Sequence, residues 1–210
     1  MSRLTVECEM GHTCLFPGKD DTRTDMVCRI PSGKDLITIS HGILNVLNIR
    51  RFNGRILVVD KDPGVIESTH YMRVGDPGNG KPSDFPKLKL LPEFLGDAAD
   101  GVRWYAERYG LRHLGGIDLD LTGTANKVVP PVERVLTVLR DYSYSKSVPV
   151  FVTYSNGRDE VRGAANRVSA LTARLGTYCI WHRCYRSDWI GRYATREQGA
   201  SMAIVGMKLL

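Results

Sequence analysis

Short runs with an apolar centre alternate along this chain with longer segments in which apolar residues recur at helical spacing. The apolar runs, most of them rich in β-branched residues, lie at residues 34–40, 55–60, 87–91, 113–121 and 148–154. Segments with helical spacing follow at residues 43–49, 63–72, 98–109, 128–140 and 161–175. Continuous apolar runs are typical of strands that are buried on both faces. The alternation therefore predicts a mostly parallel sheet with helices on either side.

The pattern changes after Gly176. Residues 178–185 and 201–209 both have the composition of strands, and no segment of helical spacing separates them, so we predict that they pair antiparallel. A chain of 210 residues with 42% hydrophobic content suits one sizeable core. The predicted fold class is α/β, a Rossmann-like three-layer αβα sandwich with a mostly parallel seven-stranded sheet and an antiparallel last strand. We expect a single domain, with residues 1–33 as an amino-terminal extension and residues 34–210 as the core.

The charge balance favours a polyanionic partner. The chain has 29 Lys and Arg against 23 Asp and Glu, a formal net charge of +6, which attracts RNA or DNA. No apolar run reaches membrane-spanning length, and the first residues lack the pattern of a secretion signal. We therefore predict a cytoplasmic protein with no membrane partner.

Cysteine and histidine residues form two candidate groups of metal ligands. The first comprises Cys8, His12, Cys14 and Cys28, and the second Cys179, His182 and Cys184. Neither group has the paired Cys-x-x-Cys spacing of zinc sites, so we interpret the cysteines as small buried residues and predict no metal. The five cysteines are an odd number, which favours reduced thiols over a disulfide framework.

Acidic residues stand at the ends of predicted strands. Asp60 ends the second run, and Asp118 and Asp120 lie two apart in the run at residues 113–121, so these two share one face of their strand. Because buried carboxylates are costly unless they are paired or hydrogen-bonded, we predict a functional role for at least one of the two. The alternative is that an acid caps the next helix, as Asp60 or Asp62 would do near Pro63, or Asp118 or Asp120 near residue 126.

These elements and motifs resemble the class I S-adenosylmethionine-dependent methyltransferases over residues 34–210. In that family the acid that ends the second strand holds the cofactor ribose, which corresponds to Asp60. A Gly-Asp-Ala motif lines the adenine, which corresponds to Asp97 and Ala98 after Gly96. The loop after the first strand also contacts the cofactor, which here implies Ser40 and Gly42. This loop departs from the family pattern because it contains one glycine instead of several.

The resemblance also covers the run Ile-Asp-Leu-Asp-Leu-Thr-Gly that contains Asp118 and Asp120. An acid in the corresponding motif lies beside the transferable methyl group, so both residues are candidate catalytic residues. The run is similar to the Asp-Leu-Asp-Pro-Phe-Gly stretch of some tRNA guanine methyltransferases, without its proline, and small viral and phage methyltransferase-like proteins carry related segments. The resemblance implies a methyltransferase that uses S-adenosylmethionine and acts on RNA or DNA.

Candidate nucleic-acid contacts lie near both ends of the chain. Cationic and aromatic residues interleave around residues 181–196, a mixture suited to phosphate contact and base stacking. The predicted contacts are Lys19, Arg183, Arg186 and Arg192. The alternative is that alternate residues of this strand face the core while the arginines are solvated.

Two other functions compete with the methyltransferase. The chain could be a non-catalytic module that keeps the fold and binds nucleic acid or an assembly partner. It could also be a Toprim-like enzyme, because Asp118, Asp120 and Gly123 fit an Asp-x-Asp-x-x-Gly pattern in which paired acids hold magnesium.

Overall fold

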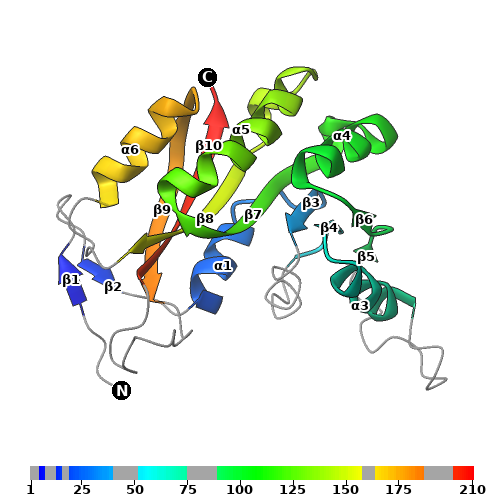
Figure 1. Ribbon diagram of the computed structural model, residues 1–210, viewed down its shortest axis with the longest axis horizontal. Helices are drawn as coiled ribbons and strands as arrows, with labels where there is room; N and C mark the ends of the chain where they lie inside the picture. Colours follow the sequence, from blue (N-terminus) through cyan, green and yellow to red (C-terminus); the bar gives the residue numbers. More distant parts are fainter. Residues whose placement is uncertain are drawn as a thin grey trace.

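The computed structural model describes residues 5–7, 13–15, 19–39, 52–74, 89–157, 164–186 and 201–210. Its centre is an eight-stranded sheet in the order β5-β4-β3-β7-β8-β10-β9, with the short strand β6 also paired to β4 (Figure 1). The strands are β3 (Asp35–Ile39), β4 (Arg55–Asp60), β5 (Lys89–Leu90), β6 (Phe94–Leu95), β7 (Leu114–Thr124), β8 (Val150–Gly157), β9 (Thr177–Arg186) and β10 (Ser201–Leu209). The helices are α1 (Lys19–Val27), α3 (Pro63–Val74), α4 (Ala98–Tyr109), α5 (Ala125–Arg140) and α6 (Ala164–Arg174). A separate hairpin joins β1 (Thr5–Glu7) to β2 (Thr13–Leu15).

The pairing of the strands confirms the predicted fold class. Strands β3, β4, β5, β6, β7 and β8 are paired parallel. Strand β10 is antiparallel to both β8 and β9, as predicted for the last two strands. The third predicted strand, residues 87–91, is observed as the short strand β5. Strand β6 was not predicted, and Pro92, which has no N–H to donate to β4, lies between the two. The helix predicted at residues 43–49 lies outside the described residues.

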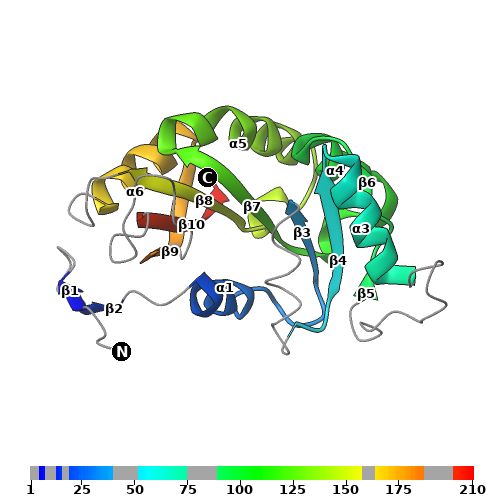
Figure 2. The ribbon, with the colours of Figure 1, turned by 60° about the horizontal axis from the view of Figure 1, so that its bottom comes forward.

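Helices cover both faces of the sheet, which explains the continuous apolar runs. Helices α4, α5 and α6 lie on one face, and α1 lies on the other (Figure 2). Within β4, Leu57 and Val59 belong to the apolar cluster under the first group of helices, whereas Ile56 and Val58 belong to the cluster that contains residues of α1. This alternation is the two-residue period of a strand with no solvent-exposed face.

Helix α1 was not predicted from the sequence. Its nine residues, KDDTRTDMV, are mostly polar, and its buried apolar residues are Met26 and Val27, followed by Ile30. These three side chains join the cluster that contains Phe151 and Tyr185 of the sheet. The segment before residue 34 therefore contributes to the core. None of the helices in the described part of the chain is long and apolar enough to cross a membrane.

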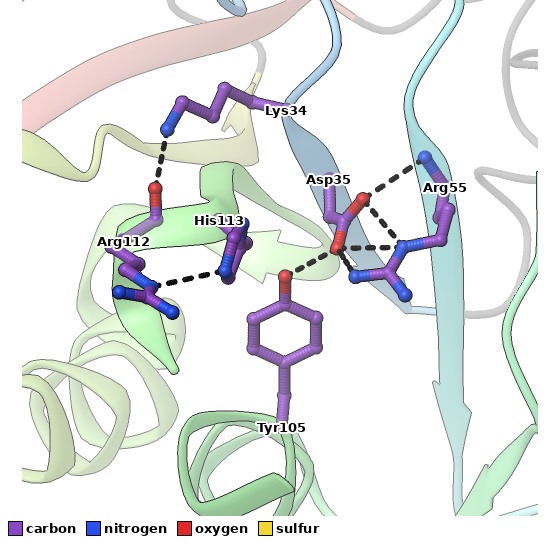
Figure 3. Close-up of polar contacts among 6 residues, drawn as sticks. All are labelled: Lys34, Asp35, Arg55, Tyr105, Arg112 and His113. Atoms are coloured by element: carbon purple, nitrogen blue, oxygen red, sulfur yellow. Dashed lines mark hydrogen bonds and ion pairs between the residues drawn. The ribbon is translucent and has the colours of Figure 1, made fainter. Parts of the chain in front are cut away.

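A polar cluster at the amino ends of β3 and β4 fixes α4 to the sheet (Figure 3). The buried carboxylate of Asp35 accepts a hydrogen bond from the hydroxyl of Tyr105 in α4. It also accepts hydrogen bonds from the backbone N–H of Arg55 at 3.1 Å and from its Nη2 at 2.6 Å. Burial and the neighbouring Asp35 raise the pKa of Tyr105, so the phenol stays neutral and serves as a donor.

Candidate active site

The predicted cofactor residues of β4 and α4 lie side by side at the carboxyl edge of the sheet. Strand β6 pairs parallel with the end of β4, with Asp60 opposite Leu95. The N–H of Gly96 donates to the carbonyl oxygen of Asp60 at 2.8 Å. Asp97 then begins α4 as its N-cap residue. The structure thus brings Asp60 and Asp97 together, whereas Ser40 and Gly42 lie outside the described residues.

The side chains of Asp60 and Asp62 have different tasks at the end of β4. Asp62, immediately before α3, accepts a hydrogen bond from the N–H of Gly64 at 2.8 Å, which is the contact of an N-cap residue. Asp60 Oδ1 accepts a hydrogen bond from the N–H of Asp62 at 2.8 Å. Of the two candidate caps, Asp62 is therefore the one that caps α3. Asp60 stays half-buried at the sheet edge.

The carboxylate of Asp97 is engaged within the protein. Oδ1 accepts hydrogen bonds from the N–H groups of Ala99 and Asp100 at 2.9 and 3.1 Å, and Oδ2 pairs with Arg134 of α5 at 2.8 Å. Partial burial acts to raise the pKa of Asp97, but these hydrogen bonds and the charge of Arg134 outweigh it and hold the pKa below its ordinary value. A ligand near this motif would meet the backbone of Ala98, whose N–H in the first turn has no intrahelical acceptor.

Asp118 and Asp120 share one cation that the sequence analysis missed. Arg23 of α1 places Nη1 at 2.8 Å from Asp118 Oδ2, and its Nη2 forms an ion pair with Asp120 Oδ2. The two acids therefore lie on one face of β7, as predicted. The N-cap of α5 is Thr124, so the alternative in which one of these acids caps that helix is wrong.

The two acids differ in their access to solvent. The side chains of Arg23 and Asp118 are fully buried, whereas that of Asp120 is 12% exposed. Asp118 lies opposite Thr38 of β3, whose hydroxyl donates to Asp118 Oδ2 at 3.3 Å. Asp120 lies two residues further toward the carboxyl edge. Of the two, Asp120 is the residue that a bound substrate could reach.

In this site the guanidinium of Arg23 is paired with both carboxylates. Complete burial raises the pKa of Asp118, and the nearby Asp120 raises it further, against the opposing effects of Arg23 and Thr38. Tyr185 of β9 lies close to the same three charged residues, and burial is the main cause that raises the pKa of its hydroxyl. If both acids are ionised, the cluster carries a net negative charge.

The predicted nucleic-acid contacts are only partly described. Lys19 begins α1 and Arg186 ends β9, but their side chains, like Arg192 altogether, lie outside what the structure describes. Arg183 forms an ion pair with Asp25 of α1. Sequence reasoning missed this partner, because Asp25 is distant in the chain.

The aromatic residues of β9 support the alternative in which alternate residues face the core. Trp181 lies edge-on to Phe151, with ring centroids 6.3 Å apart, and Arg29 lies over its ring at 5.0 Å. Tyr185 is buried in the same cluster. Trp181 and Tyr185 thus pack beneath α1.

The candidate metal ligands do not form a recognisable site in the described part of the chain, where no three Cys, His, Asp or Glu side chains gather to hold a metal ion. Cys184 is buried, as predicted, but the prediction of buried cysteines is wrong for Cys28 and Cys179, which are exposed. Cys8 and His12 lie outside the described residues, as does the side chain of Cys14. For a Toprim-like site, magnesium would have to displace Arg23 from both acids.

Strand order and pairing together define a Rossmann-like fold of the methyltransferase type. Among solved structures, an antibiotic-related methyltransferase is similar with a TM-score of 0.51 and 13% identity, over 97% of this chain and 98% of that one. A proposed SAM-dependent methyltransferase from Streptococcus mutans is similar with a TM-score of 0.54 and 11% identity, over 95% of this chain and 50% of that one. No protein-family model and no curated protein sequence matches the chain. At this low identity, the likeness is one of fold.

Proposed function

We propose that the chain is a class I S-adenosylmethionine-dependent methyltransferase that acts on RNA or DNA. The observation that supports the proposal is the position of Asp60, the Gly96–Ala98 motif and Asp120 at the carboxyl edge of one sheet with this strand order. Open α/β sheets bind ligands outside the carboxyl ends of their strands, where the strand order reverses. Here the order reverses between β3 and β7, directly beside Asp120.

The residues at this edge suit S-adenosylmethionine. The half-buried carboxylate of Asp60 is an acceptor that both ribose hydroxyls could donate to. The N–H of Ala98 would donate to the adenine side, and Asp97 would support it by fixing the first turn of α4. Ser40 and Gly42 are the proposed contacts from the loop after β3. When bound, the cofactor supplies an electrophilic methyl group.

The acids of β7 would act on the methyl acceptor. Asp120 would orient the acceptor or take its proton, because it is the acid with solvent access. Asp118 is fully buried. Its role would be to hold Arg23 in the position from which Arg23 pairs with Asp120. Because methyl transfer is an in-line displacement, the main contribution of the protein is to hold the two reactants in position.

A nucleic-acid substrate is supported by the net charge of +6. Lys19, Arg186 and Arg192 remain the proposed phosphate contacts. For Arg183, contact with phosphate would compete with its ion pair to Asp25.

Titration of the purified protein with S-adenosylmethionine by calorimetry tests the proposal. We expect binding to the wild type and a loss of at least about tenfold in affinity, about 1.4 kcal/mol, for Asp60→Ala. The matched control is Asp62→Ala, because Asp62 lies in the same loop but caps α3. Absence of heat and of thermal stabilisation at millimolar cofactor would refute the proposal. Transfer of labelled methyl groups to RNA, DNA or protein then identifies the acceptor, and Asp120→Asn should abolish it.

A non-catalytic module is the second candidate. The observation in its favour is that Arg23 neutralises part of the charge on the two acids. A fold without catalytic activity would need the same neutralisation in order to bury these acids. Such a module predicts salt-dependent nucleic-acid binding without cofactor binding.

A further inference from the structure

We propose that Arg23 is a positioning residue of the candidate active site, because it bridges Asp118 and Asp120 and so holds the Asp120 carboxylate in place at the sheet edge. The proposal rests on the methyltransferase function proposed above. It means that helix α1, outside the strands that carry the site, takes part in the reaction. It assigns Arg23 no contact with the substrate.

Arg23 fixes the position of the Asp120 carboxylate through its oxygen Oδ2. The two terminal nitrogens of Arg23 bind two different carboxylates, Nη1 that of Asp118 and Nη2 that of Asp120. A planar guanidinium held at both nitrogens cannot rotate without losing one contact. Thr38 also holds the inner acid, Asp118. The chain of contacts Thr38, Asp118, Arg23 and Asp120 therefore leads from the rigid strand β3 to the sheet edge.

The docking of α1 does not depend on Arg23 alone. Met26 and Val27 of the same helix are buried against the sheet, and Asp25 pairs with Arg183 of β9. A buried ion pair is often no more stabilising than apolar residues of similar volume. The need for an anchor is thus met elsewhere in α1, whereas Arg23 reaches the two acids.

Arg23 also opposes protonation of Asp118, because burial and the nearby Asp120 raise the pKa of Asp118 whereas the charge of Arg23 and its hydrogen bond lower it. The charged or titratable groups around Asp118 include Arg23 from α1, Asp120 from its own strand and Tyr185 from β9. Of these, Arg23 alone carries positive charge. Without it, two carboxylates would face each other in a buried site, and one of them would hold a proton at higher pH. With Asp118 ionised, both ends of the Arg23 guanidinium stay paired and the Asp120 carboxylate is held in place.

The test compares Arg23→Gln with Arg23→Lys, and uses Asp25→Asn as the matched control in the same helix. For Arg23→Gln we expect kcat for methyl transfer at neutral pH to fall at least about tenfold, and the acid limb of the kcat profile to move up by about one pH unit or more. The dissociation constant for S-adenosylmethionine should change less than about threefold. Lysine keeps the charge but cannot bridge both acids as a fork, so Arg23→Lys should restore the acid limb and only part of kcat. Asp25→Asn should leave kcat at saturating substrate and its pH profile unchanged, because the Arg183 that it releases would change only the affinity for nucleic acid.

A readout without turnover separates this inference from the proposed function. Carbon-13 NMR of the aspartate carboxyl groups in the cofactor-free protein should show Asp118 titrating at higher pH in Arg23→Gln, and at lower pH in Asp120→Asn, where Arg23 serves Asp118 alone. If Arg23→Gln does not fold, Arg23→Lys and Asp120→Asn give the same comparison. Wild-type protein that binds no cofactor would refute the methyltransferase, whereas unchanged Asp118 titration in these variants would refute the role of Arg23. A uniform fall of kcat at every pH, or an equal fall for Asp25→Asn, would show a structural role only.

Discussion

Asp35→Asn should strongly destabilise the protein, because this side chain joins three elements at the amino edge of the sheet. Asp35 is 3% exposed, and its carboxylate accepts hydrogen bonds from Tyr105 and from the backbone and guanidinium of Arg55. Asparagine has nearly the same shape, but one of its two terminal atoms is a donor that would face other donors. Loss of one partner of a buried ion pair costs about 3–5 kcal/mol. Because the Arg55 side chain is 38% exposed, we expect the lower end, about 3 kcal/mol.

Equilibrium unfolding in urea at neutral pH measures this loss, and Tyr105→Phe is the matched control. The phenylalanine removes one donor but leaves Asp35 paired with Arg55, so its cost should be about 1 kcal/mol. Asp35→Asn should therefore be the more damaging of the two substitutions. A cost for Asp35→Asn below about 1 kcal/mol, or one equal to that of Tyr105→Phe, would show that the ion pair with Arg55 adds no stability to the cluster.

Two further changes test the packing and capping near the candidate site. Asp97→Ala should cost about 1–2 kcal/mol in urea unfolding at neutral pH. Because the pKa of Asp97 is lowered in the folded protein, this contribution is present above about pH 4 and is lost as the pH falls through the lowered value, so variant and wild type should converge in acid. Gly101→Ala should cost about 1–3 kcal/mol, because a Cβ there would lie 2.5 Å from Val59 Cγ2. The added truncation Val59→Ala should recover part of that loss, and no recovery would contradict the close approach of α4 to β4.

The fold could be predicted largely because the strands are buried on both faces. In β4 every residue from Ile56 to Val59 is fully buried, so the whole run had to be apolar, and its predicted limits agree with the observed strand. Helix α1 gave no such signal, since a short helix that buries residues near one end has no apolar stripe. The sequence pattern of such an element resembles that of a polar loop.

The part of the site that follows from strand ends could also be predicted. Asp60 and Asp97 come after neighbouring parallel strands, so their closeness follows from topology. The task of the Asp97 carboxylate was foreseeable in part, because an aspartate before a helical pattern is an N-cap signal. Its second partner, Arg134, lies on α5 and reaches Asp97 only through the packing of two helices.

Arg23 could not be identified from the sequence as the partner of the two acids. Two acids in a buried strand require a cation, so the need for a partner was visible in Asp118 and Asp120. The chain has 29 Lys and Arg, and nothing local distinguishes the one that is buried, because its selection depends on where α1 docks. Two acids and one cation buried together are often no more stabilising than apolar residues of similar volume. Stability alone therefore does not account for this cluster, which agrees with the role proposed for Asp120.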